Sequence, residues 1–216
     1  MLLDVLNDGS FLNIVISIVS SLFVIFCVLP IHELAHAWVA HLCGDDTAKW
    51  YGRLTFNPLS HIDWFGAASI LLFGFGWAKP VPVNQRNFKN PKLGMALVGL
   101  AGPLANLVSG FVLLAIACLF LRLASSFILF TFFYVAAQIS ISLAVFNLIP
   151  VPPLDGSKIL FAFLPDRFYY KIIQYERYIY YAVLFLMATG AFSKPVGIGT
   201  SYILDLFLNF FASVLS

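Results

Sequence analysis

The sequence predicts an all-α polytopic membrane protein, and three observations lead to this fold class. Of its 216 residues, 61% are hydrophobic and only 10% are charged. The mean hydropathy of +0.94 lies outside the range of soluble domains. The charges are also clustered, and a bilayer core about 30 Å thick needs only about 20 uncharged helical residues. The uncharged runs are Gly9–Ile31, Trp64–Ala78, Leu93–Leu121, Leu123–Leu154, Tyr178–Ser193 and Leu206–Ser216.

The runs predict the elements in chain order. The first run leads directly into "HELAH" at 32–36, so we expect one helix to span the membrane and continue through that sequence. The runs beginning at Leu93 and Leu123 predict two further spanning helices, and residues 167–216 predict extra C-terminal helices. Together with the short run at 64–78, we expect about five or six transmembrane or re-entrant helices.

Residues 64–84 are expected to be irregular. The run Trp64–Ala78 is marginal in length and contains three glycines, which weaken a straight helix. Pro80 and Pro82 each favour extended backbone in the residue before them. We therefore expect a short membrane-associated extended or β segment near residues 78–84.

The positions of lysine and arginine predict the topology. Basic residues gather between the first helix and Leu93, and again after Asp155. The positive-inside rule places both regions in the cytoplasm, so the run at 64–78 enters and leaves on that side or lies along the membrane. We expect a multi-pass protein of the cell (inner) membrane. The basic residues on which this prediction rests are Lys49, Arg53, Lys79, Arg86, Lys89, Lys92, Lys158, Arg167, Lys171 and Arg177.

The sequence "HELAH" predicts a metal site. His32 and His36 are four residues apart, about 6 Å along one helix face, so both imidazoles can reach one ion. Glu33 lies beside them, where a carboxylate can take a proton from a metal-activated water. Such sequences also occur by chance on soluble helices, but ionisable groups at membrane depth are costly and by default functional. His41 lies about 140° round the helix from His36 and is not expected to join them.

Hydrolytic zinc sites use three protein ligands, so one further group is needed. Asp155 follows a long uncharged run within "FNLIPVPPLDGSK", where three prolines interrupt the helix. Irregular backbone at membrane depth is tolerated only against protein or water, which suits a ligand-bearing break. The alternative is that Asp155 is the N-cap of the following helix.

Three other polar residues have two readings each. Asn106, with a glycine four residues before it and another four after, either packs helices through a hydrogen bond or donates to the oxyanion formed during peptide hydrolysis. Asn147 has the same two readings. We expect His61, in "NPLSHID", to satisfy loop backbone groups rather than to bind metal.

Several of these sequences together resemble a known family, the site-2 proteases, which are intramembrane zinc metalloproteases. The similarity to the compact bacterial and archaeal branch covers residues 26–158 and rests on "HELAH", "NPLSHID", "GWAKPVPVN", "AGPLAN" and "FNLIPVPPLDG". The resemblance implies that His32, His36 and Asp155 bind Zn²⁺, that Glu33 is the general base, and that water reaches the site from the cytoplasm.

We therefore expect a single membrane metalloprotease domain over residues 1–216 that cleaves transmembrane or membrane-proximal segments of substrate proteins. The rival hypothesis is a metal-binding membrane transporter or a catalytically silent homologue with the same ligands. The expected partners are a substrate helix and the lipid bilayer. A net charge of +2, without a basic stripe interleaved with aromatic residues, gives no reason to expect nucleic acid. The oligomeric state has no signature in the sequence.

Overall fold

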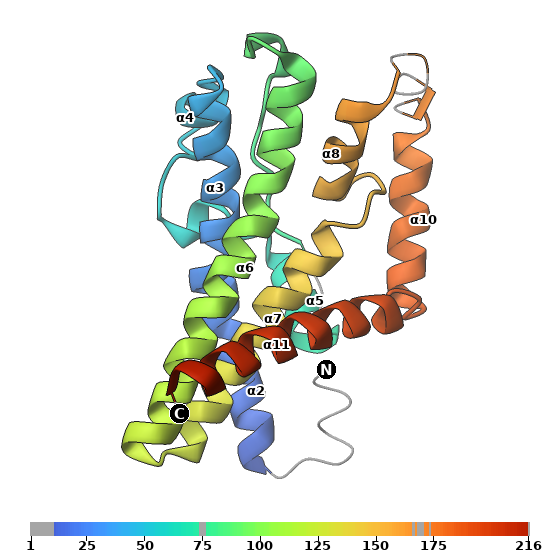
Figure 1. The fold of residues 1–216 in the computed structure, drawn as a ribbon. Coiled ribbons are helices and arrows are strands. Elements are labelled where there is room, and N and C mark those ends of the chain that lie inside the picture. Colours follow the sequence, from blue (N-terminus) through green and yellow to red (C-terminus); the bar gives the residue numbers. More distant parts are fainter. Residues whose placement is uncertain (1–10, 74–76, 166, 168–170, 173, 216) are drawn as a thin grey trace.

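The computed structural model describes residues 11–73, 77–165, 167, 171–172 and 174–215, and these form a helical bundle (Figure 1). No β-strand occurs within these ranges, so the predicted all-α class is confirmed. The helices are α2 (Phe11–Phe23), α3 (Leu29–Leu42), α4 (Thr47–Trp50), α5 (Trp64–Phe73), α6 (Pro91–Ala124), α7 (Phe127–Asn147), α8 (Asp155–Phe163), α10 (Glu176–Ala188) and α11 (Ser193–Leu215).

Four helical stretches are long and apolar enough to cross a membrane, and the protein is an integral membrane protein. Many large apolar side chains on these helices are exposed, as lipid contact requires. α11 crosses the bundle at a steep angle and packs against α6 and α7 (Figure 1). The four stretches are Phe11–Leu42, Pro91–Ala124, Phe127–Asn147 and Ser193–Val214.

α2 and α3 are two parts of one helix, joined by a π-helical turn at Val24–Val28. Pro30 follows this turn; it has no N–H, and its ring clashes with the carbonyl four residues earlier. That carbonyl belongs to Phe26, inside the wider π turn, so the irregular turn and the proline coincide. On the α2 side of the turn, the Ser20 hydroxyl donates to the carbonyl of Phe132 in α7 (3.0 Å).

α6 is the central helix and packs against α3, α7 and α8. Figure 1 shows it running antiparallel to α3. Its glycines mark where neighbours come closest: a Cβ atom at each would lie 2.3–2.8 Å from the nearest atom of the facing group. Small residues permit such close packing between membrane helices. Gly99, Gly102 and Gly110 lie at such contacts with other helices, whereas Gly94 faces Phe88 in the connection just before α6.

The main buried apolar cluster joins the first helix, α5, α6, α7 and α11. Val24, Ile25, Leu114 and Ile141 are among its most buried members. This cluster fixes the first helix against α6 and α7 on the N-terminal side of His32, so the histidines project from a rigid support.

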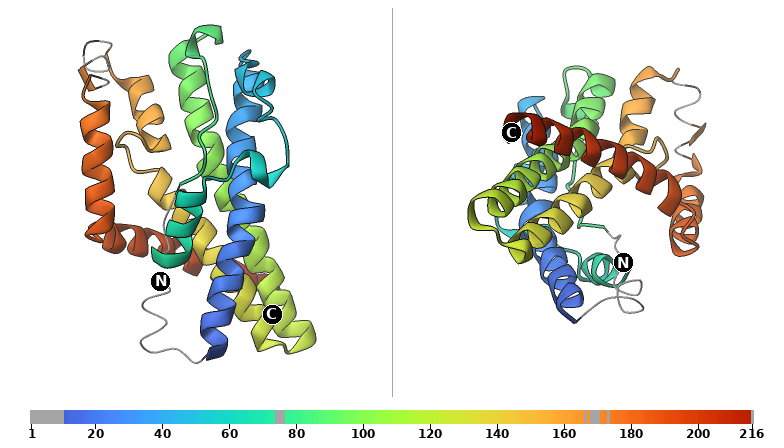
Figure 2. Two further views of the ribbon diagram at one scale, coloured as in Figure 1. Left: turned by 180° about the vertical axis from the view of Figure 1, so that it is seen from behind. Right: turned by 60° about the horizontal axis from the view of Figure 1, so that its bottom comes forward.

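α5 is too short to cross the membrane. Its ten residues extend about 15 Å, half the thickness of a bilayer core. The end of the predicted run, at residues 74–76, lies outside the described residues. The chain at 78–84 has no regular secondary structure, and no described segment pairs with it as a strand, so the β-strand alternative of the prediction is wrong. In Figure 2 (left) it runs as a stretched chain from α5 toward α6.

We expect the ends of the bundle to face opposite sides of the membrane, with α4 and the start of α6 in the cytoplasm. Single cysteines at Thr47, Lys89 and Ser126, in a background lacking Cys27, Cys43 and Cys118, test this. Only the cysteine at Ser126, between α6 and α7, should react with a membrane-impermeant thiol reagent in intact cells. Permeabilised cells provide the control, in which all three should react. Labelling of Lys89→Cys but not Thr47→Cys from outside would contradict the arrangement.

Candidate active site

α3 presents two histidines and a glutamate in the interior of the bundle. His32, Glu33 and His36 have exposed fractions of only 4%, 8% and 5%. The histidines are one helical turn apart, and their Nε2 atoms lie 3.0 Å from each other. Spacing along one helix face therefore brings both ring nitrogens to one point, as the sequence predicted.

Asp155 completes a group of three ligand atoms. Its Oδ2 lies 3.1 Å from Nε2 of His36 and 3.4 Å from Nε2 of His32. Tetrahedral zinc with bonds of about 2.0–2.2 Å holds its ligand atoms roughly 3.3–3.5 Å apart. Two imidazoles and one carboxylate, with a fourth position left for water, form a donor set of hydrolytic zinc sites. The three residues thus fit a zinc ion.

The orientation of His36 is fixed by α6. Its Nδ1 donates to the backbone carbonyl of Val98 at 2.6 Å, which leaves Nε2 free to bind a metal. Such outer-shell hydrogen bonds select the tautomer and hold the ring of a metal-binding histidine.

Two glycines of α6 let the ligands meet. A Cβ atom at Gly102 would lie 2.3 Å from Nε2 of His36 and 2.6 Å from Nε2 of His32. A Cβ atom at Gly99 would lie 2.8 Å from the backbone oxygen of Asp155. α6 therefore forms a wall against which both histidines and the start of α8 are packed.

Asp155 is the first residue of α8, and Leu154 occupies the N-cap position. The alternative reading of Asp155 as an N-cap is therefore wrong; its carboxylate faces the histidines instead. The proline-rich connection folds back over the next residue, where a Cβ atom on Gly156 would lie 2.2 Å from the carbonyl oxygen of Leu148. A glycine is thus required beside Asp155 by close approach of the backbone.

Sequence reasoning missed Lys158. Its Nζ lies 2.8 Å from Oδ1 of Asp155, so one carboxylate oxygen faces the histidines and the other pairs with the ammonium group. The spacing of three residues within one helix was the available signal. Lys158 holds the carboxylate in the orientation that the metal site needs.

A cavity of about 380 Å³ lies against this group. It is lined by the two histidines, Glu33 and Asp155, and on another side by Pro80, Val81 and Val83 of the stretched segment. Glu33 is thus placed to act on a molecule that reaches the metal, and the stretched segment borders the same space.

The two asparagines lie in different places. Asn147 lines the cavity, and its Nδ2 donates to the carbonyl of Leu143 (3.0 Å). Asn106 is fully buried and does not line that cavity. Its backbone carbonyl accepts a hydrogen bond from the Ser140 hydroxyl of α7 (2.8 Å), whereas its side-chain oxygen and nitrogen have no partner among the described residues.

The other two histidines lie outside the ligand group. His41 pairs with Asp46 and is about one-third exposed. His61 is fully buried, and its Nε2 donates to the carbonyl of Thr55 (2.9 Å). Burial lowers the pKa of His61, so it is neutral at pH 7 and suited to this structural contact. Both agree with the sequence-based expectations.

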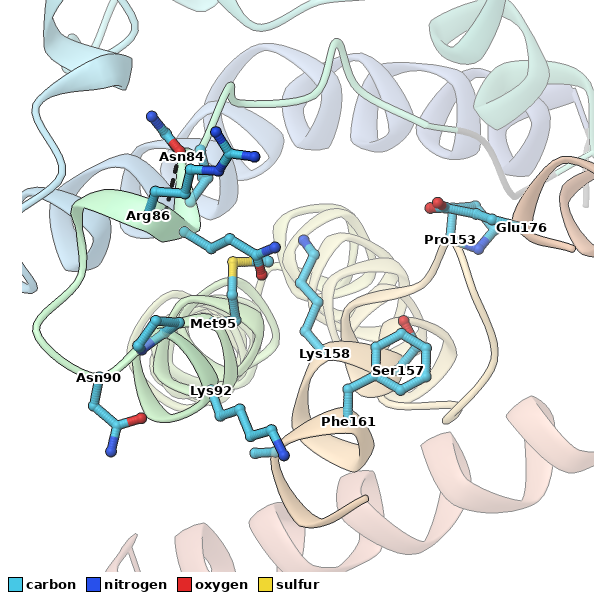
Figure 3. A pocket seen from close by; sticks show the side chains of 14 residues that line it. Asn84, Arg86, Asn90, Lys92, Met95, Pro153, Ser157, Lys158, Phe161 and Glu176 are labelled. Atoms are coloured by element: carbon cyan, nitrogen blue, oxygen red, sulfur yellow. Dashed lines mark hydrogen bonds between the residues drawn. The ribbon is translucent and has the colours of Figure 1, made fainter. Parts of the chain in front are cut away.

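A larger cavity of about 980 Å³ adjoins the first, and the two share Val83, Pro153 and Lys158. Figure 3 shows Lys158, Arg86 and Lys92 around it, from α8, from the segment before α6 and from α6. The metal-binding group is therefore approached from the end of the bundle that carries these basic residues.

Replacing any of the three ligand residues should remove zinc. His32→Ala, His36→Ala and Asp155→Ala are each expected to lower zinc affinity at least about tenfold, the loss seen even for outer-shell partners. His41→Ala is the matched control, from the same helix. Metal analysis of the purified proteins measures the effect, and full zinc occupancy in the Asp155 variant would require a different third ligand.

Gly102→Ala should also lower zinc content, because its methyl group would displace the imidazoles. We expect a loss in zinc affinity of about 10–100-fold, within the range for outer-shell changes. Gly197→Ala is the control, since a Cβ atom at this glycine of α11 meets nothing within 4 Å. Unchanged zinc affinity of the Gly102 variant, measured by competition with a chelator, would show that α6 does not confine the histidines.

Several known proteins are similar to this chain. A model of peptidase family M50 matches residues 122–190. A Bacillus subtilis (strain 168) protein named "Putative zinc metalloprotease YwhC" is 44% identical over 194 residues, which cover 85% of this chain and 89% of the relative. "Putative zinc metalloprotease Rip2" of Mycolicibacterium smegmatis is 25% identical over 196 residues, 88% of this chain and 74% of the relative.

A Methanocaldococcus jannaschii protein named as a zinc metalloprotease is 30% identical over 146 residues, 68% of this chain and 34% of the relative. No solved structure matches the chain significantly. The matches confirm the expected zinc metalloprotease with its zinc cofactor, and they give no support to the rival reading as a transporter. The chain therefore belongs to peptidase family M50, the site-2 protease family of zinc metalloproteases.

Proposed function

We propose that this metalloprotease is a single membrane domain that cleaves substrate proteins within or beside their transmembrane segments, on the cytoplasmic side of the cell membrane. The observation that carries the proposal is the buried group of His32, His36 and Asp155, whose two histidines lie on a helix long and apolar enough to span the membrane. His32 lies about 30 Å along that helix from Phe11, roughly one bilayer core. The site thus lies toward the end of the span that joins the basic loops.

In this proposal His32, His36 and Asp155 hold the zinc ion, which when bound acts as a Lewis acid and lowers the pKa of a water molecule to about 7. Glu33 accepts a proton from the attacking water as the new C–O bond forms at the peptide carbonyl. It then returns this proton to the amide nitrogen as the C–N bond breaks. Lys158 keeps Asp155 oriented throughout, and Asn147 lines the cavity as a candidate donor to the developing oxyanion.

A substrate helix must unwind before cleavage, because its amide groups are already hydrogen-bonded within the helix. The stretched segment at 78–84 supports a mode of binding by strand addition. The N–H and C=O groups of Val81 and Val83 make no hydrogen bond to any other described residue, although both residues line the cavity. Pro80 and Pro82 have no N–H, so backbone donors remain at Val81 and Val83. In an extended chain such alternate residues direct their N–H groups to the same edge, where another strand can pair with them.

Glu33→Gln should abolish cleavage and retain zinc, because an amide cannot accept the proton and the ligands are untouched. We expect a fall of at least about 100-fold in cleavage rate. The assay is co-expression with single-span membrane proteins tagged at both ends, which also traps uncut partners for crosslinking. Near-normal cleavage by this variant would exclude Glu33 as the base.

Val81→Pro should weaken substrate binding, because it removes an N–H that strand addition would use. The loss of one hydrogen bond predicts a fall of roughly three- to tenfold in kcat/KM with unchanged zinc content. Val81→Ala is the matched control, since it shortens the side chain and keeps the N–H. Equal activity of the two variants would argue against pairing through this residue.

A further inference from the structure

Two buried charged residues hold the ends of the segment at 78–84. Asp45 has no exposed surface, and Arg53 is only 7% exposed. Neither residue lines the cavity that contains the ligand group. Both belong to the connection between α3 and α5, so they link the helix that carries His32 and His36 to the segment on the other side of the cavity.

Asp45 binds the C-terminal end of the segment. Its Oδ2 accepts a hydrogen bond from the backbone N–H of Asn84, and its Oδ1 accepts one from Nδ2 of Asn87, both at 2.7 Å. Thr47 donates to Oδ1 through its backbone N–H (3.1 Å) and its hydroxyl. Burial alone would raise the pKa of Asp45, but these hydrogen bonds lower it, so the carboxylate is ionised at neutral pH.

The neighbours of Asp45 reinforce this attachment. A Cβ atom on Gly44, which has a φ of +104°, would lie 3.3 Å from the carbonyl oxygen of Asn87. Phe88 is buried with Ala40 of α3 and Val98 of α6. The chain just beyond the segment is thus packed against α3, which carries His36, and against α6, which orients its ring.

Arg53 binds the N-terminal end of the segment. Its Nη1 donates to the carbonyls of Ser60 and Lys79, the latter at 3.4 Å, and its Nη2 donates to the carbonyl of Pro80 at 3.2 Å. The backbone N–H of Lys79 donates to the carbonyl of His61 (2.9 Å). The planar guanidinium can bind several carbonyls at once, which a lysine ammonium does less well.

Between these two attachments, the backbone of Val81 and Val83 is bonded to no other described residue. A segment fixed at both ends and unpaired in its middle is suited to receive another extended chain, because little conformational freedom remains to be lost on pairing. A purely structural role would need no such unpaired centre bordering the catalytic cavity.

We propose that Asp45 and Arg53 are positioning residues that hold residues 78–84 at a fixed place opposite the zinc ligands, so that an extended substrate pairs with the segment in reach of Glu33. This inference rests on the proposed function. Asp45 and Arg53 act on the substrate only through the segment, and they contact neither the zinc ligands nor the reacting atoms.

Asp45→Asn and Arg53→Gln test the inference. Each should raise KM roughly tenfold, because apparent affinity falls with the fraction of molecules whose segment is correctly placed. The kcat and the zinc content should change little. Hydrogen exchange at the backbone N–H groups of Lys79 and Asn84, which are hydrogen-bonded in the native enzyme, should become faster in the free variants. The matched controls are Asp46→Asn, an adjacent carboxylate paired with His41, and Arg122→Gln at the far end of α6.

A disulfide provides the rescue. In the background lacking the native cysteines, Asp45→Cys with Asn84→Cys should show a high KM when reduced and a KM near that of the background when oxidised, because the bond restores the attachment without the charge. The KM of Arg53→Lys should lie between those of the native enzyme and Arg53→Gln.

The outcomes separate this inference from the proposed function. If the native enzyme cleaves no membrane substrate, the proposed function fails. If the native enzyme cleaves and the two variants have native KM values, the positioning role is overturned. It is also overturned if the rise in KM is accompanied by a fall in both zinc content and kcat. A raised KM with native zinc content, reversed by the disulfide, supports it.

Discussion

The contact on which the site depends is the approach of α6 to the two imidazoles of α3. Gly102 leaves room for both rings, and the carbonyl of Val98, one turn earlier, orients His36. At Gly99 the same helix meets the backbone of Asp155. One helix therefore sets the separation of ligands that lie more than a hundred residues apart in the chain, and side chains larger than hydrogen at these positions would push the ligands apart.

Lipid supplies little hydrophobic force between membrane helices, so close packing and hydrogen bonds must hold the bundle together. Carbonyl groups supply many of the bonds seen here. The backbone carbonyl of Val98 accepts a hydrogen bond from the His36 ring, that of Phe132 from the Ser20 hydroxyl, and that of Asn106 from the Ser140 hydroxyl. These bonds fix the first helix (α2 and α3), α6 and α7 to one another around the buried ligands. The buried carboxylate of Asp155 likewise has a charged partner in Lys158.

Local patterns carried much of the prediction. Spacing within one helix identified His32, Glu33 and His36, the break after an uncharged run identified Asp155, and two prolines identified the stretched segment. The contacts of Gly102 with the two histidines, and those of Asp45 and Arg53 with the stretched segment, could not be predicted. These partners are 26–70 residues away in the chain, and no helical or strand period encodes such separations. Asn106 shows the same difficulty. The glycines four residues before and after it indicated which residues share its helix face, but whether that face lines the cavity depends on tertiary packing.

The π-helical turn has a consequence for how the first helix is used. One added residue in a helical turn rotates everything beyond it by about 100°. The part before the turn, α2, faces α7 through Ser20, and the part after it, α3, faces α6 through His36. In a regular α-helix Ser20 and His36, sixteen residues apart, would point about 160° apart around the helix axis, and the added residue reduces this angle to about 60°. The two side chains therefore point to neighbouring sides of the first helix, where α7 and α6 lie packed against each other.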